Sequence, residues 1–341
     1  MADKLYVGVS PHIHNRESVS KVMWAVCVAL IPSGLAGVFI FGFSALKVIL
    51  VSVLSCVLTE ALIQKSRGKK ITVSDGSAVL TGLLLAYNLS SSVPFWIPMA
   101  GGIFAIVVCK QAFGGLGANI FNPALAARAF LLASWPKQMT SFAKPFSLDA
   151  ISSATPLAIL KEQSAKSLSD LGLSYADLFL GRRGGCLGEV CLIALLLGAA
   201  YLLWKGYIWF QAPAGLILSL GFLSWAFSPQ GFFKGDFLFS ILSGGLILGA
   251  FFMATDYVTT PLTKKGQLVF GIGCGLIAFV IRRFGGYPEG VSYSILMMNA
   301  AVPLIDRWVR PRRYGVVKSN IKYQNDKSKI KIFKTFLDFS L

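Results

Sequence analysis

Long runs of apolar residues recur along the chain, and they constrain its fold more than any other feature. A helix rises about 1.5 Å per residue, so roughly 20 apolar residues cross a hydrocarbon core of about 30 Å. The clear runs are Ser20–Phe41, Phe43–Gln64, Pro94–Phe113, Leu187–Trp204, Ile208–Phe227, Phe237–Met253 and Gln267–Ile281. Weaker runs that contain Asn, Gly, Pro or Arg predict short or broken helices: Gly76–Leu89, Asn119–Trp135 and Val291–Val309. The pattern predicts an all-α polytopic membrane protein with about ten transmembrane helices.

The composition supports this fold class. Of the 341 residues, 55% are apolar and 14% are charged, whereas soluble domains carry roughly a quarter charged residues. The net charge is +17. We interpret it as loop charge that orients a membrane protein rather than as a nucleic-acid surface, so the lipid bilayer is the expected partner.

Basic residues also predict an orientation and a domain organisation. Lysines and arginines fill the loop 65–70 and the segment from 307 onward. With ten spans, both segments lie on the side of the N-terminus, and the positive-inside rule makes that side cytoplasmic. The predicted parts are a cytoplasmic leader without a removable signal peptide, two membrane halves, an external loop and a basic cytoplasmic tail. In chain order they cover residues 1–19 (leader), 20–135 (first half), 136–185 (loop), 186–309 (second half) and 310–341 (tail).

An internal repeat relates the two membrane halves. Segment 110–119, which contains Phe-Gly-Gly, is echoed at 282–290, and segment 82–88 aligns with 249–255. Because each half has an odd number of spans, the second enters the membrane from the opposite side, which predicts two inverted five-helix repeats. Such repeats often hold a ligand or an ion at their interface, on interrupted helices. The Gly-Gly pairs are candidate interruptions, and close helix packing is the equally weighted alternative.

Polar residues on or beside the broken spans are candidates for a flavin or ion pathway. They are Gly114, Gly115, Asn119, Asn122, Asp75, Asn88 and Thr255. Asn119 and Asn122 could instead satisfy backbone groups freed by Pro123. Carboxylates in a membrane usually have a partner or a function, although interfacial water could solvate most of those here. The acidic residues near span ends are Glu60, Asp75, Glu189, Asp236 and Asp256.

The positions of the cysteines and histidines argue against a metal site formed by this chain alone. The six cysteines are scattered without a CxxC pair, and the histidines, His12 and His14, precede the first span. We therefore expect no disulfide, no iron–sulfur cluster supplied by this chain, no haem held by membrane histidines and no metal site.

The predicted external loop contains a short motif that ends at Thr155. By local rules, Thr155 is a helix N-cap and Pro156 occupies the first helical position. The segment also resembles the acceptor sequence of flavin transferases, Asp-x-x-(Ser/Thr)-Gly-Ala-Thr, in which the threonine hydroxyl becomes a phosphodiester with FMN. The residues that match this recognition pattern, with serine in place of glycine, are Asp149, Ser152, Ser153 and Ala154. A phosphate at a helix start would be favoured by free N–H groups.

The whole chain resembles one family between about residues 5 and 315. The matching segments are Ser10-Pro-His12, Asp75–Ala86, Phe113–Arg128 and the motif at Thr155. They are similar to the D subunit of the Rnf complex, an ion-translocating ferredoxin:NAD oxidoreductase of bacterial membranes, in the RnfD/NqrB family. The B subunit of the sodium-pumping NADH:quinone reductase is the alternative. Because that protein has a longer segment before its first span, the Rnf relative is favoured.

This resemblance implies a redox subunit of a translocase in the bacterial inner membrane. It implies FMN attached covalently to Thr155 on the outer face, and relatives also hold a second flavin, riboflavin, non-covalently among the helices. Electrons would pass between ferredoxin and NAD with coupled movement of Na⁺ or H⁺. The implied partners are the other Rnf subunits A, B, C, E and G, especially the FMN-bearing G subunit. The repeat also resembles the urea-channel architecture, so a passive channel or transporter is a competing hypothesis, as is a purely structural scaffold.

Overall fold

Helices make up most of the protein in the computed structural model, which describes residues 17–146, 152–153, 155–162, 174–228 and 231–310. Within these residues, three helices are long and apolar enough to cross a membrane: α1 (Val19–Phe41), α2 (Phe43–Ser66) and α13 (Lys264–Phe284). Shorter apolar helices are α3 (Ser77–Tyr87), α4 (Trp96–Ile106), α5 (Pro123–Ser134), α9 (Leu192–Trp204) and α10 (Gln211–Ala226). The prediction of a helical, polytopic membrane protein is confirmed.

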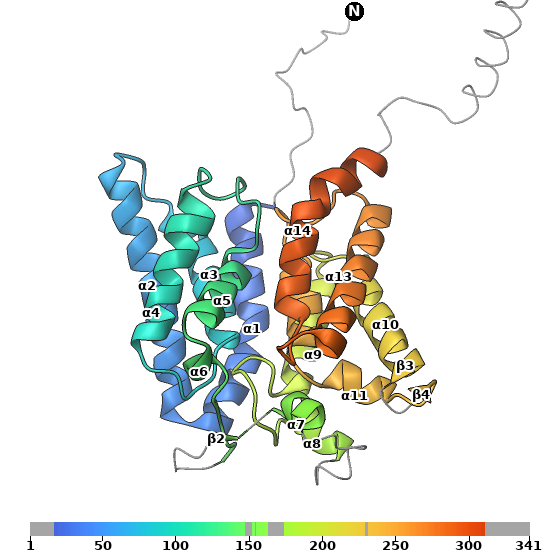
Figure 1. Ribbon diagram of the computed structural model, residues 1–341. Coiled ribbons are helices and arrows are strands. Elements are labelled where there is room, and N and C mark those ends of the chain that lie inside the picture. Colours follow the sequence, from blue (N-terminus) through green and yellow to red (C-terminus); the bar gives the residue numbers. More distant parts are fainter. Residues whose placement is uncertain (1–16, 147–151, 154, 163–173, 229–230, 311–341) are drawn as a thin grey trace, which may run out of the picture.

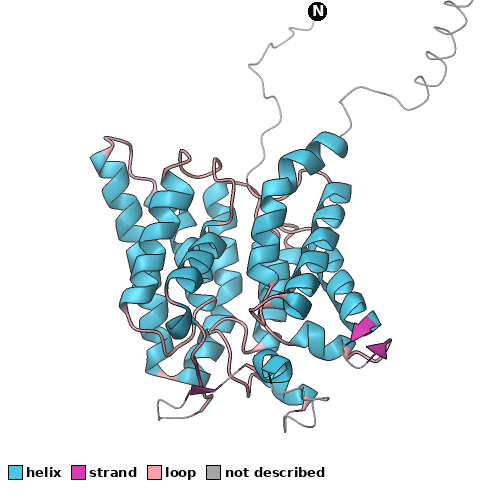
Figure 2. Cartoon of the chain, viewed as in Figure 1, coloured by secondary structure: helices cyan, strands magenta, loops and turns pink. Residues whose placement is uncertain are grey.

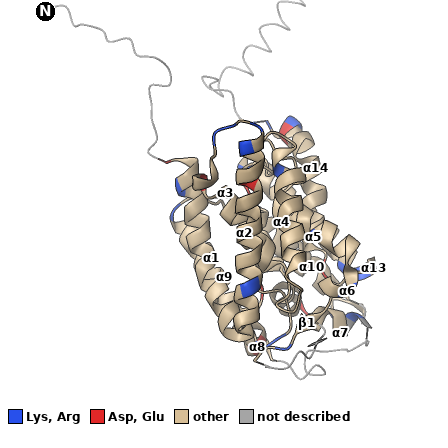
Figure 3. Ribbon diagram, turned by 90° about the vertical axis from the view of Figure 1, so that its left-hand side faces the viewer, with Lys and Arg blue, Asp and Glu red and all other residues tan. Residues whose placement is uncertain are grey.

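Apolar side chains cover the outside of the molecule as well as its core. Leu35, Phe39 and Leu62 on α1 and α2 are at least 66% exposed. Figure 3 shows lysines and arginines gathered toward the two ends of the helices, with little charge along the sides between them. A soluble protein rarely exposes such a continuous apolar surface, so these sides face lipid.

The chain folds into two groups of helices that meet at α1 and α9 (Figure 1). In the first group α2 packs on α3 and α4, and in the second α10 packs on α13, which contacts α14 (Val291–Trp308). The start of α1 and the end of α14 lie at one end of the molecule. The connecting segment between the groups lies at the other end. It contains α6 (Pro136–Met139), α7 (Pro156–Glu162), α8 (Tyr175–Leu180) and the antiparallel strands β1 (Phe142–Ala143) and β2 (Ser152–Ser153).

Strands are few and short among the described residues (Figure 2). Besides β1 and β2, a second antiparallel pair follows α10 and consists of β3 (Phe227–Ser228) and β4 (Gly231–Phe232). The sheets therefore contribute little to the core, which is formed by packed helices.

The prediction of one regular span over Phe237–Met253 is wrong. The segment is divided into α11 (Phe237–Leu242), α12 (Leu246–Leu248) and the π-helix η4 (Gly249–Met253). Its helix is interrupted because Ser243 is extended and Gly244 has a φ of 70°, a left-handed conformation that glycine adopts without strain. A further π-helix, η2 (Val107–Gln111), ends α4. Such single π-helical turns often occur at functional sites.

The glycine pair Gly114–Gly115 lies in the turn between η2 and α5. Its φ angles are 121° and 106°, values that favour glycine. A Cβ atom on Gly115 would have no neighbour within 4 Å. The alternative of close helix packing is therefore wrong for Gly115, which is required by the turn.

Candidate functional site

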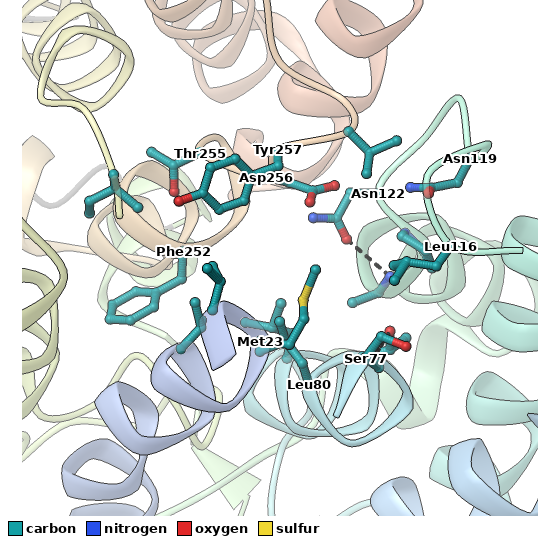
Figure 4. A pocket seen from close by; sticks show the side chains of 18 of the residues that line it. Met23, Ser77, Leu80, Leu116, Asn119, Asn122, Phe252, Thr255, Asp256 and Tyr257 are labelled. Carbon is teal, nitrogen blue, oxygen red and sulfur yellow. Dashed lines mark hydrogen bonds between the residues drawn. The ribbon is translucent and has the colours of Figure 1, made fainter. Parts of the chain in front are cut away.

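A pocket of about 770 Å³, including its mouth, opens between the two helix groups at the end where α1 begins (Figure 4). Its walls come from α1, α3, the end of α9, η4 and the segment 116–124. Three of the predicted pathway residues line it: Asn119, Asn122 and Thr255. Residues from both halves of the chain thus contribute to one pocket.

The two sides of the pocket differ in chemistry. Figure 4 shows Asn119, Asn122, Thr255, Asp256 and Tyr257 along one side, with Met23, Leu80 and the single polar residue Ser77 labelled opposite them. Apolar walls with a few polar groups are typical of small-molecule and cofactor sites.

The asparagines on the polar side are held in place by backbone hydrogen bonds. Asn122 caps α5, because its Oδ1 accepts from the N–H groups of Ala124 (3.1 Å) and Leu125 (3.4 Å). The Asn119 side-chain amide donates to the carbonyl of Phe121 (3.2 Å). Asn122 therefore satisfies backbone groups beside Pro123, as the alternative predicted, and also lines the pocket.

Asp256 lies in the turn after η4 and faces the same pocket. Burial raises the pKa of its carboxyl, and a hydrogen bond from the Thr259 hydroxyl (3.0 Å) opposes that rise. The sequence singled out Asp256 only as an acidic residue at a span boundary. Its contribution to the pocket depends on the turn that follows the π-helix.

A buried ion pair adjoins the pocket. Lys110, a lining residue on η2, donates to Glu60 Oε2 (2.8 Å) on α2 and to Ser77 Oγ (2.6 Å) on α3. The Ser77 hydroxyl in turn donates to Asp75 Oδ1 (2.6 Å), which also accepts from the Ser77 N–H (2.8 Å). Asp75, in the 3-10 turn η1 (Val73–Asp75), therefore does not line the pocket but binds the lining residue Ser77.

A second buried charge cluster lies between α5, α14 and the connecting segment. Arg128 donates to Asn88 Oδ1 (2.7 Å) and Ser292 Oγ (3.1 Å) and pairs with Glu289. Asn88, predicted as a pathway residue, thus belongs to this cluster. Sequence reasoning missed Arg128 and Glu289 as site residues, although an arginine inside an apolar span was the signal that could have found Arg128.

The cluster also contains three groups with the spacing of metal ligands. Cys186 Sγ and carboxylate oxygens of Glu189 and Glu289 lie within 4.8 Å of one another. The Arg128 guanidinium contacts Glu289 and approaches Cys186 Sγ at 3.7 Å. It therefore already supplies the positive charge that a metal ion would bring.

Thr155 directly precedes α7, which lies at the opposite end of the molecule from the pocket (Figure 1). Its Oγ1 accepts from the N–H of Ala158 (3.2 Å), and the residue is 4% exposed. The prediction that Thr155 caps a helix is confirmed. Ser152 and Ser153 form β2 opposite β1, whereas Asp149 and Ala154 lie outside the described residues.

Comparison with known proteins identifies the family. The model of the NQR2, RnfD, RnfE family matches residues 6–315. The chain belongs to this family. Relatives include the D subunit of the proton-translocating ferredoxin:NAD(+) oxidoreductase complex of Clostridium ljungdahlii, 48% identical over 91% of this chain and 96% of that protein. Another is the D subunit of the Na(+)-translocating ferredoxin:NAD(+) oxidoreductase complex of Acetobacterium woodii, 49% identical over 92% of this chain and 96% of the relative.

A third relative has a name that specifies no ion. It is the D subunit of the ion-translocating oxidoreductase complex of Stutzerimonas stutzeri, 40% identical over 88% of this chain and 93% of that protein. All three names place the relatives in multi-subunit oxidoreductase complexes that move ions. The predicted membership of the RnfD/NqrB family is confirmed.

Proposed function

We propose that this chain is the D subunit of an Rnf-type complex and relays electrons between ferredoxin and NAD through FMN attached to Thr155. The observation that carries the proposal is the placement of Thr155 at the start of α7, with its Oγ1 as the capping atom. That hydroxyl has the chemistry of a phosphodiester acceptor, and the family relatives are subunits of ion-translocating oxidoreductases. The FMN would supply reversible electron transfer at this end of the molecule.

The pocket is the proposed site of the second flavin, a riboflavin held without a covalent bond. Isoalloxazine rings are flat and apolar on their faces, with hydrogen-bonding atoms along one edge. The pocket offers Met23 and Leu80 on one side and amide groups of Asn119 and Asn122 on the other. The Asn119 amide can accept through its Oδ1, and each amide has a second N–H to donate, which matches an edge that carries N–H and C=O groups. The two proposed flavin sites would then lie at opposite ends of the helices.

The Asn119→Leu variant tests this pocket. Removing one amide from the polar side is expected to weaken riboflavin binding by roughly tenfold, since a buried hydrogen bond contributes about 1 to 2 kcal/mol. Flavin released by acid precipitation measures the non-covalent pool. The flavin that remains bound to the precipitated chain is the internal control and should not change. Equal released flavin from the variant and the wild type at limiting riboflavin would contradict the assignment.

The proposed topology has about ten spans in two inverted five-helix repeats. The packing of α2 on α4 corresponds to that of α10 on α13. The connection after η2 lies at the end where α1 begins, whereas the connection between α13 and α14 contacts α7 through Lys161 at the other end. These features support the inversion. The termini would face the cytoplasm and the connecting segment the outer side of the inner membrane.

The partners in this proposal are the A, B, C, E and G subunits, with the G subunit nearest in the electron path. Relatives of nearly equal identity are named for different ions, one for protons and one for Na⁺. The proposal therefore covers translocation of Na⁺ or H⁺. The alternative, the B subunit of the sodium-pumping NADH:quinone reductase, belongs to the same family.

Fluorescence of the denatured protein tests the covalent flavin directly. When the chain is produced in cells that contain the flavin transferase, its band on a denaturing gel should fluoresce under ultraviolet light, because an ester bond survives denaturation. The same chain from cells without the transferase is the control and should be dark. A dark band in both cases would contradict the redox proposal and favour a passive channel.

A further inference from the structure

The buried cluster beneath α7 contains more positive than negative charge. Its guanidinium groups belong to Arg128, Arg183 and the partly buried Arg282, and its carboxylates belong to Glu189 and the partly buried Glu289. Arg128 pairs with Glu289. Among the described residues, no carboxylate lies within 4.0 Å of a side-chain nitrogen of Arg183 or Arg282. Within the described part of the chain, three guanidinium groups against two carboxylates leave a surplus of one positive charge.

Backbone carbonyls, rather than anions, hold these two arginines. Arg282 donates to the carbonyls of Ser240 (2.8 Å) and Ser243 (3.2 Å), while its Nε is buried without a partner. Arg183, 4% exposed, donates to the carbonyl of Glu189 (3.1 Å). The carboxylates of Glu189 and Glu289 act on both arginines only from beyond 4.0 Å, and a buried charge without a directly bonded counter-ion is unfavourable. Among the described residues, the buried Nε of Arg282 and the buried Oε1 of Glu289 both lack a hydrogen-bond partner, so Arg282 retains an unused N–H donor for an anion.

The loop helix α7 lies directly on this cluster. Gly244 is the point of contact, because a Cβ atom there would lie 2.9 Å from Leu157 Cδ1 and 3.2 Å from Arg282 Nη2. Leu157 is two residues from Thr155, at the start of the same helix. Lys161, one turn further along α7, donates to the carbonyl of Tyr287 (3.3 Å). The start of α7, which follows Thr155 directly, thus lies over Gly244, and Gly244 in turn adjoins Arg282.

We propose that Arg282, supported by Arg183, binds the phosphate of the flavin ester on Thr155. This inference rests on the proposed function and adds a binding site to it. A phosphodiester carries one negative charge, which matches the surplus of the cluster. Guanidinium N–H groups form strong, charge-assisted hydrogen bonds to phosphate oxygens. The phosphate would therefore neutralise the cluster and fix α7 against the second helix group.

The test compares Arg282→Gln with Arg283→Gln, each with and without covalent flavin. Arg283 is the matched control because it is the next residue of α13 and is exposed. In the wild type and in Arg283→Gln, flavin attachment should raise the apparent Tm. In Arg282→Gln this rise should be absent. Any general loss of stability from the lost bonds to Ser240 and Ser243 affects both flavin states and cancels in the difference.

A second readout is the release of flavin from the folded protein by a phosphodiesterase. Because a charge-assisted hydrogen bond protects the ester only while the phosphate is bound, release from Arg282→Gln should be roughly ten times faster than from the wild type. Equal release rates together with an equal rise in Tm would overturn the proposal. A wild-type chain that carries no covalent flavin would instead refute the proposed function.

Inorganic phosphate is the probe for a free anion at the same place. If phosphate raises the Tm of the flavin-free wild type but not of flavin-free Arg282→Gln, the cluster binds phosphate chemistry as proposed. Should phosphate stabilise the flavin-loaded wild type just as strongly, the ester phosphate does not occupy the site. That result would overturn the assignment to the flavin ester.

Discussion

Replacing Thr155 with alanine is expected to abolish covalent flavin and to reduce ferredoxin:NAD electron transfer by the assembled complex to background. Alanine has no hydroxyl, so no phosphodiester can form at the start of α7. The proposed relay then lacks its redox group at that end of the molecule. In-gel fluorescence of the denatured chain measures attachment, and the rate of ferredoxin-dependent NAD reduction by the purified complex measures electron flow.

The Thr155→Ser variant separates chemistry from folding in this experiment. Serine keeps a hydroxyl for the ester and for the hydrogen bond to the Ala158 N–H, so both flavin attachment and activity should persist. Loss of an N-cap costs about 0.5–2 kcal/mol, and the alanine variant should therefore still assemble with its partners. Undiminished electron transfer by an assembled, flavin-free alanine variant would assign the chain a scaffold role.

The sequence was sufficient to predict the helices that face lipid. The boundaries expected for the first two spans, Ser20–Phe41 and Phe43–Gln64, agree closely with α1 and α2. Apolar side chains that face lipid form an uninterrupted run, so hydropathy detects these helices directly. The capping role of Thr155 was also predictable, because it depends on a side chain and backbone groups three residues apart.

Interruptions inside the membrane were harder to predict. The segment that contains Ser243 and Gly244 is as apolar as an ordinary span, and its break depends on backbone conformation and on Arg282 bonding to the freed Ser243 carbonyl. That partner is 39 residues away in sequence. Periodicity and composition carry no information about such a contact, since any nearby donor could satisfy the carbonyl.

The pocket was predictable only in part, for the same reason. Asn119, Asn122 and Thr255 were singled out as polar residues near broken spans, and the fold brings them together. Asn88 is also a polar residue near a broken span, but its side chain accepts a hydrogen bond from Arg128. Lys110 was not singled out as a site residue. Its position at the pocket follows from its pairing with Glu60, which lies on another helix.

Replacing Lys110 with methionine is expected to lower the free energy of unfolding by about 3 to 5 kcal/mol, because it leaves Glu60 as a buried, unpaired carboxylate. Both residues are 2% exposed. The apparent Tm of the flavin-free protein in detergent measures the effect. The Lys47→Met variant is the control, since Lys47 is exposed on the same helix as Glu60 and its replacement should change stability by less than about 1 kcal/mol.

Combining Lys110→Met with Glu60→Gln removes both charges and should restore most of the lost stability, since replacing a whole buried pair is often nearly neutral. If the double variant is no more stable than Lys110→Met alone, the loss arises from altered packing and not from the unpaired charge.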